Sequence, residues 1–137
     1  CPYIGVLALN AIFASDCVIV PVSTDYLSLQ AAEHITRTLK VLEPVLKRRV
    51  NRRYLLTRFD RRRRMSEDVR NRLRTNYGDE VLETAISENV AVAESPSHHR
   101  DVFRQNPSSP GANDYRRLLE ELIDRGDLKL QKELCWN

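Results

Sequence analysis

Apolar and polar positions along the chain alternate between two periodicities. Short apolar runs rich in β-branched residues are separated by longer stretches with helical spacing. The pattern predicts strands at 16–22, 52–59 and 81–86, and helices at 3–14, 28–50, 66–76 and 114–125. Because strands and helices alternate, we expect an α/β fold with a parallel sheet flanked by helices. A chain of 137 residues is long enough for one domain with its own core.

Several local signals refine these boundaries. The strand run Asp16–Val22 is apolar on both faces, as in a buried parallel strand. Pro44 is expected to kink or split the long helix that contains it. Ser66 is expected to cap the next helix, and residues 106–113 read as a turn-rich connector. Gly126 is expected to end the last helix.

A basic segment interrupts an otherwise acidic chain. Between Lys47 and Arg74 there are thirteen Lys or Arg residues against three Asp or Glu, although the whole chain carries only +3. The run Arg61–Arg64 directly follows a predicted strand, and ligands of parallel sheets bind at the carboxyl ends of the strands. Two interpretations remain open. The arginines contact a polyanion, or they form a solvated loop paired with neighbouring carboxylates.

Other chemistry is sparse. The cysteines are odd in number and lack metal-ligand spacing, which favours a reducing, cytoplasmic location; they are Cys1, Cys17 and Cys135. No run approaches the roughly 20 apolar residues of a membrane span, so we expect no membrane partner. His98 and His99 are adjacent and lack further ligands at suitable spacing, so we expect no metal site.

Several segments, taken in order, resemble a known family. They are "CPYIGVLALNA" (1–11), "VIVPVSTDYLSL" (18–29), "LLTRFDRR" (55–62) and "NVAVAESPSHH" (89–99) followed by "SPGANDYRRL" (109–118). Together they resemble the C-terminal half of a ParA/Soj-type chromosome or plasmid partitioning ATPase, a deviant-Walker P-loop NTPase of the MinD/cobyrinic acid a,c-diamide synthase-like superfamily. The resemblance implies a partial, three-layer P-loop NTPase fold. Residues 1–126 would form the C-terminal part of that domain and 127–137 a tail.

The resemblance also implies ATP hydrolysis with ATP and magnesium as cofactors of the complete protein. Cys1-Pro2 match the end of the family's switch II motif, whose aspartate is not among these residues. The phosphate-binding loop is also missing, and the four glycines are isolated. Without such a loop and its lysine, phosphates and magnesium are not held. We therefore expect a fragment with no catalytic residue and no ATPase activity of its own.

The resemblance assigns two sets of binding residues. Thr57, Phe59 and Ser87 would lie on the adenine side of the nucleotide, although Ser87 and Glu88 replace the family's usual proline and arginine. The following residues would contact nonspecific DNA through its phosphates, in a salt-sensitive manner: Arg61, Arg62, Arg63, Arg64, Arg100, Arg116 and Arg117.

Partners follow from the same reasoning. The resemblance implies a ParB-like partner protein in addition to DNA. Without flanking strands from the rest of such a domain, the apolar strand near residue 20 would be an unprotected sheet edge, so we expect self-association. The alternative function is a stand-alone interaction or assembly module that has lost nucleotide chemistry.

Overall fold

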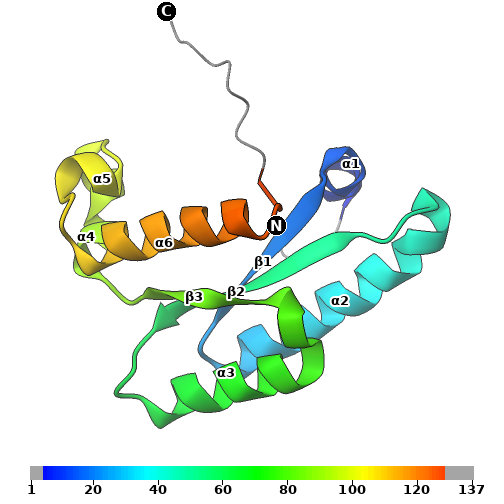
Figure 1. The fold of residues 1–137 in the computed structure, drawn as a ribbon, viewed down its shortest axis with the longest axis horizontal. Helices are drawn as coiled ribbons and strands as arrows, with labels where there is room; N and C mark the ends of the chain where they lie inside the picture. The colour runs from blue at the N-terminus through cyan, green and yellow to red at the C-terminus, as the bar shows by residue number, and fades with distance from the viewer. Residues whose placement is uncertain (1–4, 129–137) are drawn as a thin grey trace, which may run out of the picture.

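A three-stranded parallel sheet forms the centre of the protein (Figure 1). The structure is a computed structural model that describes residues 5–128. The strands β1 (Cys17–Ser23), β2 (Asn51–Phe59) and β3 (Val81–Ser87) lie in the order β1-β2-β3. The α/β class and the parallel sheet predicted from the sequence are confirmed.

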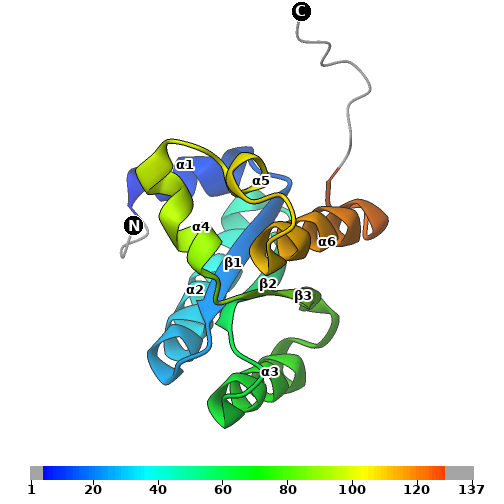
Figure 2. The same cartoon turned by 90° about the vertical axis from the view of Figure 1, so that its left-hand side faces the viewer.

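Helices cover both faces of this sheet. They are α1 (Val6–Ala14), α2 (Tyr26–Leu46), α3 (Arg64–Tyr77), α4 (Val90–Glu94), α5 (Val102–Gln105) and α6 (Pro110–Asp124), with short 3-10 helices at Gly78–Glu80 and Ser95–His98. α2 and α3 lie on one face and α6 on the other, so the fold has three layers (Figures 1 and 2). Within residues 5–128, no helix combines the length and apolar composition that crossing a bilayer requires.

The core is divided by the sheet into two clusters. Successive side chains of a strand point to opposite faces. Tyr54 and Leu56 therefore pack toward α2 and α3, whereas Leu55 packs toward Leu118 and Leu122 of α6. The buried residues of α2 are Leu29, Ala32, Thr36 and Leu39, spaced three or four positions apart as in an amphipathic helix.

A polar contact is buried within the larger cluster. Tyr54 is 0% exposed, and its ring stacks on Tyr77 with the centroids 4.1 Å apart. Its hydroxyl lies 2.5 Å from Thr36 Oγ1, which donates a hydrogen bond of 2.7 Å to the carbonyl oxygen of Ala32. The Thr36 oxygen therefore accepts from the Tyr54 hydroxyl, and both polar groups are satisfied.

Three boundary predictions were wrong. α2 does not split at Pro44, because the proline falls in the last turn and the helix runs on to Leu46. α3 begins at Arg64, so Ser66 lies inside the first turn, buried and without a hydrogen-bond partner for its Oγ among residues 5–128. α6 begins at Pro110 within the predicted connector, because the Ser109 Oγ accepts from the Ala112 N–H at 3.2 Å.

The first turn of α6 packs closely against α4. A Cβ atom on Gly111 would lie 2.3 Å from a methyl carbon of Val92, so only glycine lets the first turn of α6 approach α4 this closely. At the other end, Gly126 has φ +73° and follows the last helical turn, as the sequence predicted.

The two edges of the sheet differ. The register between β2 and β3 shifts, and the N–H groups of Glu83 and Thr84 donate to the Glu121 carboxylate on α6, both at 2.8 Å. Asp114 on α6 likewise accepts from the Ser87 N–H at 2.9 Å. By contrast, β1 pairs only with β2 among residues 5–128, and Ile19 is 42% exposed. The β3 edge is therefore protected and the β1 edge is open.

The segment after α6 is anchored at the amino end of β2. The Asp127 carboxylate accepts from Arg53 Nε at 2.5 Å, from Arg53 Nη2 at 2.9 Å and from Asn51 Nδ2 at 2.9 Å. The hydrogen bonds from Arg53, followed by that from Asn51, hold the pKa of Asp127 below its usual value despite partial burial.

We expect the two single substitutions that break the Thr36–Tyr54 hydrogen bond to lower the unfolding free energy by different amounts. Thr36→Val leaves the Tyr54 hydroxyl buried without an acceptor and should lower the unfolding free energy by about 2 kcal/mol. Tyr54→Phe removes the donor while Thr36 keeps its bond to Ala32, so the loss should be about 1 kcal/mol. Urea unfolding checks the order, and a larger loss in Tyr54→Phe would contradict the assignment.

Asp127 predicts a pH dependence of stability. Because its folded pKa is lowered, its stabilisation is present above the ordinary aspartate pKa of about 3.9 and is lost as the pH falls through the folded pKa. At pH 7, Asp127→Asn should lower the unfolding free energy by about 2 kcal/mol, and this difference from the wild type should shrink in acid. Asp124→Asn, on the exposed end of α6, is the matched control and should change stability by less than about 0.5 kcal/mol. A difference that is independent of pH would contradict the role of the carboxylate.

Candidate functional site

The loop after β2 begins with an irregular residue. Arg58 has φ +52°, and the register with β3 shifts between Leu56 and Phe59. This bulge breaks the alternation of side chains, so Phe59 packs into the same cluster as Leu56. The chain then leaves the sheet, and the side chains of Arg61–Arg64 are exposed.

Asp60 organises this loop. Its Oδ1 accepts from the N–H of Arg62 at 2.9 Å, and its carbonyl oxygen accepts from the N–H of Arg63 at 3.0 Å. The turn directs the Arg62 side chain, which is 95% exposed, away from the core. The arginine run is therefore a structured loop that leads into α3.

Carboxylates pair with only part of the arginine run. Arg63 lies 3.5 Å from Asp60 and 3.7 Å from Glu88, and Arg62 lies 3.7 Å from Asp60. Arg61 and Arg64 make no ion pair within residues 5–128. Exposed pairs of this length contribute at most about 1 kcal/mol, so they do not prevent the arginines from contacting another anion.

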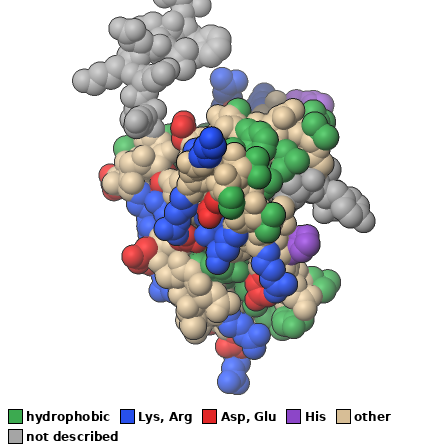
Figure 3. All heavy atoms as spheres, turned by 90° about the vertical axis from the view of Figure 1, so that its right-hand side faces the viewer, with side chains coloured by type: hydrophobic (Ala, Val, Ile, Leu, Met, Phe, Trp, Pro, Cys, Tyr) green, Lys and Arg blue, Asp and Glu red, His purple; other side chains and the backbone are tan. Residues whose placement is uncertain are grey.

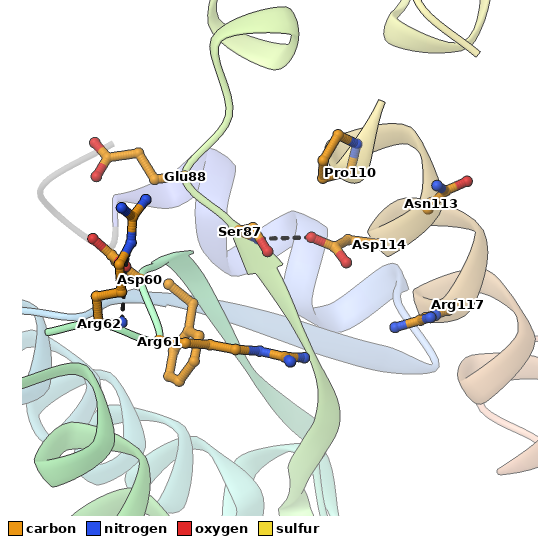
Figure 4. Close-up of a pocket in the computed structure, with 10 residues that line it drawn as sticks. Asp60, Arg61, Arg62, Ser87, Glu88, Pro110, Asn113, Asp114 and Arg117 are labelled. Carbon is orange, nitrogen blue, oxygen red and sulfur yellow. Dashed lines mark hydrogen bonds and ion pairs between the residues drawn. The ribbon is translucent and has the colours of Figure 1, made fainter. Parts of the chain in front are cut away.

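A cavity of about 570 Å³ lies at the carboxyl ends of β2 and β3. It is lined by Phe59, Asp60, Arg61, Arg62, Ser87, Glu88, Pro110, Asn113, Asp114 and Arg117. Figure 4 shows Arg61 and Arg117 pointing toward each other from the loop after β2 and from α6. Ser87 and Asp114 lie between these elements, joined by the hydrogen bond from the Ser87 N–H.

The structure separates the sequence-predicted arginines. Arg61, Arg62 and Arg117 line the cavity. Arg63 ends the loop, and Arg64 is the first residue of α3. Arg116 points elsewhere, because its guanidinium lies 5.4 Å from the Phe103 ring centroid and donates to the Pro107 carbonyl oxygen. Arg100 does not line the cavity.

The basic segment from Lys47 to Arg74 is not one surface. Near the amino ends of the strands, its arginines form ion pairs with carboxylates of the same chain. Arg49 and Arg52 pair with Glu80, Arg53 with Asp127 and Arg74 with Glu83. Figure 3 views this end of the molecule, where Lys and Arg side chains are intermixed with Asp and Glu. The exposed arginine run lies at the opposite end, which faces the viewer in Figure 2.

The sequence predicts Arg117 of α6 at this site but not the first turn of the helix. Pro110 and Asn113 line the cavity, although the sequence pattern predicts a connector over residues 106–113. The pair Ser109-Pro110 carried the missing signal, because serine caps a helix and proline is favoured at its first position.

Only two of the three residues predicted to lie on the adenine side of a nucleotide line the cavity. Phe59 and Ser87 line the cavity, whereas Thr57 does not. The Phe59 ring is buried with the Arg70 guanidinium 4.0 Å from its centroid, and the Ser87 N–H is already bonded to Asp114. No glycine-rich loop occurs in the sequence to cradle phosphates. The residues present therefore do not fit a complete nucleotide, and we derive no step of ATP chemistry from them.

Metal ligands do not gather at the site. Among the described residues, His, Cys, Asp and Glu side chains form no group of three or more that could hold a metal ion. His98 and His99 lie in the segment between α4 and α5, away from the residues that line the cavity.

Comparison with known proteins finds relatives that align with most of this chain. No protein-family model matches the chain. The chromosome-partitioning ATPase Soj of Thermus thermophilus is 36% identical over 125 residues, which cover 90% of this chain and 50% of Soj. The chromosome partitioning protein ParA of Caulobacter vibrioides is 33% identical over 125 residues, covering 90% of this chain and 47% of ParA. The sporulation initiation inhibitor protein Soj of Bacillus subtilis is 31% identical over 126 residues, covering 91% and 50%.

A solved structure supports the fold. A structure described as a partition protein superimposes with a TM-score of 0.59 at 16% sequence identity, covering 87% of this chain and 31% of that one. The chain spans about half the length of the curated relatives it matches. The aligned relatives and the three-layer parallel fold agree with the resemblance found in the sequence, and the chain is a homologue of the ParA/Soj chromosome-partitioning ATPases over about half their length.

Proposed function

We propose that this chain is the C-terminal, DNA-contacting part of a ParA/Soj-type partition protein, with residues 1–126 belonging to its NTPase domain. The observation that supports this most is the arginine run after β2. Arg61–Arg64 are exposed at the carboxyl end of the sheet, and Arg61 and Arg64 make no ion pair within the described residues. Backbone phosphates of DNA are the partners that such an array suits.

The proposed binding is independent of sequence. Exposed guanidinium groups on a short loop neutralise phosphates, and they do not present a helix or ribbon that enters a groove and reads base edges. Each phosphate contact releases condensed counterions, so the affinity should fall steeply with salt.

We propose ATP hydrolysis, a ParB-like partner and a cytoplasmic location only for the complete protein. ATP hydrolysis with magnesium would require a phosphate-binding loop, and this sequence contains none. A ParB-like partner and a cytoplasmic location are part of the same proposal, because a partition ATPase acts on DNA inside the cell. The chain alone should release no phosphate from ATP.

A DNA titration tests the proposed surface. Fluorescence anisotropy with a labelled duplex of about 30 base pairs should show binding that weakens with salt. Arg62→Ala combined with Arg64→Ala should lower the affinity at least about tenfold and reduce the salt slope by about two. Arg37→Ala combined with Arg49→Ala is the matched control, because it removes the same charge at two other exposed arginines. Arg37 lies on α2, and Arg49 lies just before β2. Equal losses in both double variants would contradict a defined surface.

The second candidate function is an assembly module, which the open edge of β1 favours. β1 exposes Ile19 and pairs only with β2 among residues 5–128, and the apolar helix α1 buries none of its described side chains. A second copy that pairs along this edge would satisfy the free backbone groups and cover the apolar side chains.

Light scattering tests whether the chain assembles through β1. At tens of micromolar, the chain should have a mass above that of a monomer, and Ile19→Lys should restore the monomer by placing a charge on the edge strand. Val45→Lys adds the same charge to another exposed apolar position, on α2, and should leave the mass unchanged. A monomeric wild-type chain would exclude assembly through β1.

A further inference from the structure

We propose that a second, smaller cavity in this protein binds a tetrahedral phosphate group. The cavity has a volume of about 210 Å³ and lies beside β3, between α3 and α6. One water molecule takes about 30 Å³ of liquid, so the cavity has room for a phosphate with part of its hydration shell. It adjoins the larger cavity and shares five lining residues with it: Phe59, Arg61, Ser87, Asp114 and Arg117. The resemblance assigns Arg61 and Arg117 to DNA contact, but it does not assign Arg70 or a discrete phosphate site.

Three arginines from three separate elements line this cavity. Arg61 comes from the loop after β2, Arg70 from α3 and Arg117 from α6. Figure 4, which draws the lining of the larger cavity, shows the Arg61 and Arg117 side chains directed toward each other, and both residues also line the smaller one. Guanidinium groups offer paired N–H donors that match the oxygens of a phosphate, and several of them around one space suit a dianion.

Arg70 is held in place before any ligand arrives. Its guanidinium lies 4.0 Å from the Phe59 ring centroid, and its Nη1 donates to the two Glu67 carboxylate oxygens at 3.1 and 3.3 Å. The Arg70 side chain is 23% exposed, so it is partly withdrawn from solvent yet still reaches the cavity. Fixing a long side chain in advance lowers the entropy that binding would otherwise cost.

The carboxylates that line the cavity already have partners. Glu83 is paired with Arg74, and Asp114 accepts from the Ser87 N–H at 2.9 Å. Arg61 and Arg117 have no carboxylate partner within residues 5–128. Asp114 keeps its negative charge, because the backbone N–H of Ser87 is a neutral donor. Arg61 and Arg117 together outweigh this one charge, so the lining side chains that are in no ion pair within the described residues carry a net positive charge.

The phosphate group has two possible sources with the same chemistry. It belongs to a small phosphorylated molecule or inorganic phosphate, or it is one backbone phosphate of a bound DNA. The first source is independent of the proposed function, whereas the second would place a specific phosphate contact at the edge of the proposed DNA surface.

Thermal unfolding of the full chain in sodium phosphate tests the site, with sodium chloride at matched ionic strength as the reference. Phosphate should raise the melting temperature in a saturable manner, and isothermal titration should give a single site. Arg61→Gln and Arg117→Gln should each weaken phosphate binding at least about fivefold. Arg72→Gln, an exposed arginine on α3 outside this cavity, should bind as the wild type does. No difference between phosphate and chloride, or equal loss in the Arg72 variant, would overturn the proposal.

A second arm identifies the source. The duplex titration is repeated with Arg117→Gln and with Arg72→Gln. A larger loss of DNA affinity in Arg117→Gln assigns the site to a backbone phosphate, and equal DNA affinity with weakened inorganic phosphate binding assigns it to a free phosphate. Because the Arg62/Arg64 double variant leaves this cavity's three arginines in place, its result tests the proposed function separately.

Discussion

Three hydrogen bonds from backbone N–H groups of β3 to carboxylates of α6 determine how the site is assembled. Glu121 accepts from the N–H groups of Glu83 and Thr84, and Asp114 accepts from that of Ser87. Hydrogen bonds to a charged acceptor are each worth about 1.5–3 kcal/mol, and without them the irregular part of β3 would leave its donors unpaired. The same bonds hold α6 against β3, which places Arg117 opposite Arg61 of the loop after β2.

The opposite edge of the sheet has no such protection among the described residues. β1 has one strand neighbour, exposes Ile19, and follows a helix that buries none of its described side chains. The relatives are about twice as long as this chain, so half of each has no counterpart in it. One edge of the sheet is therefore completed by side chains of the chain itself, and the other is open for pairing.

The sequence predicted the features that depend on periodicity. The three strands, the parallel sheet and the position of Arg61–Arg64 after a strand agree with the structure. It did not predict the positive φ of Arg58, because a bulge reflects the fit between neighbouring strands. Nor did the sequence show which arginines of the basic segment are ion-paired and which are exposed. The pairs with Glu80 and Asp127 join residues that lie far apart in the chain. The nucleotide-side role of Thr57, Phe59 and Ser87 stays a prediction.

Mapping of amide chemical shifts during titration with a short DNA duplex tests the central claim most directly. The account predicts that the changes are concentrated in residues 60–65 and in the first half of α6, because these segments carry the exposed arginines at the carboxyl end of the sheet. Amide shifts near the amino ends of the strands should change little, because the arginines there form ion pairs with carboxylates of the same chain. Changes centred on the amino end or on β1, with residues 60–65 unaffected, would contradict it.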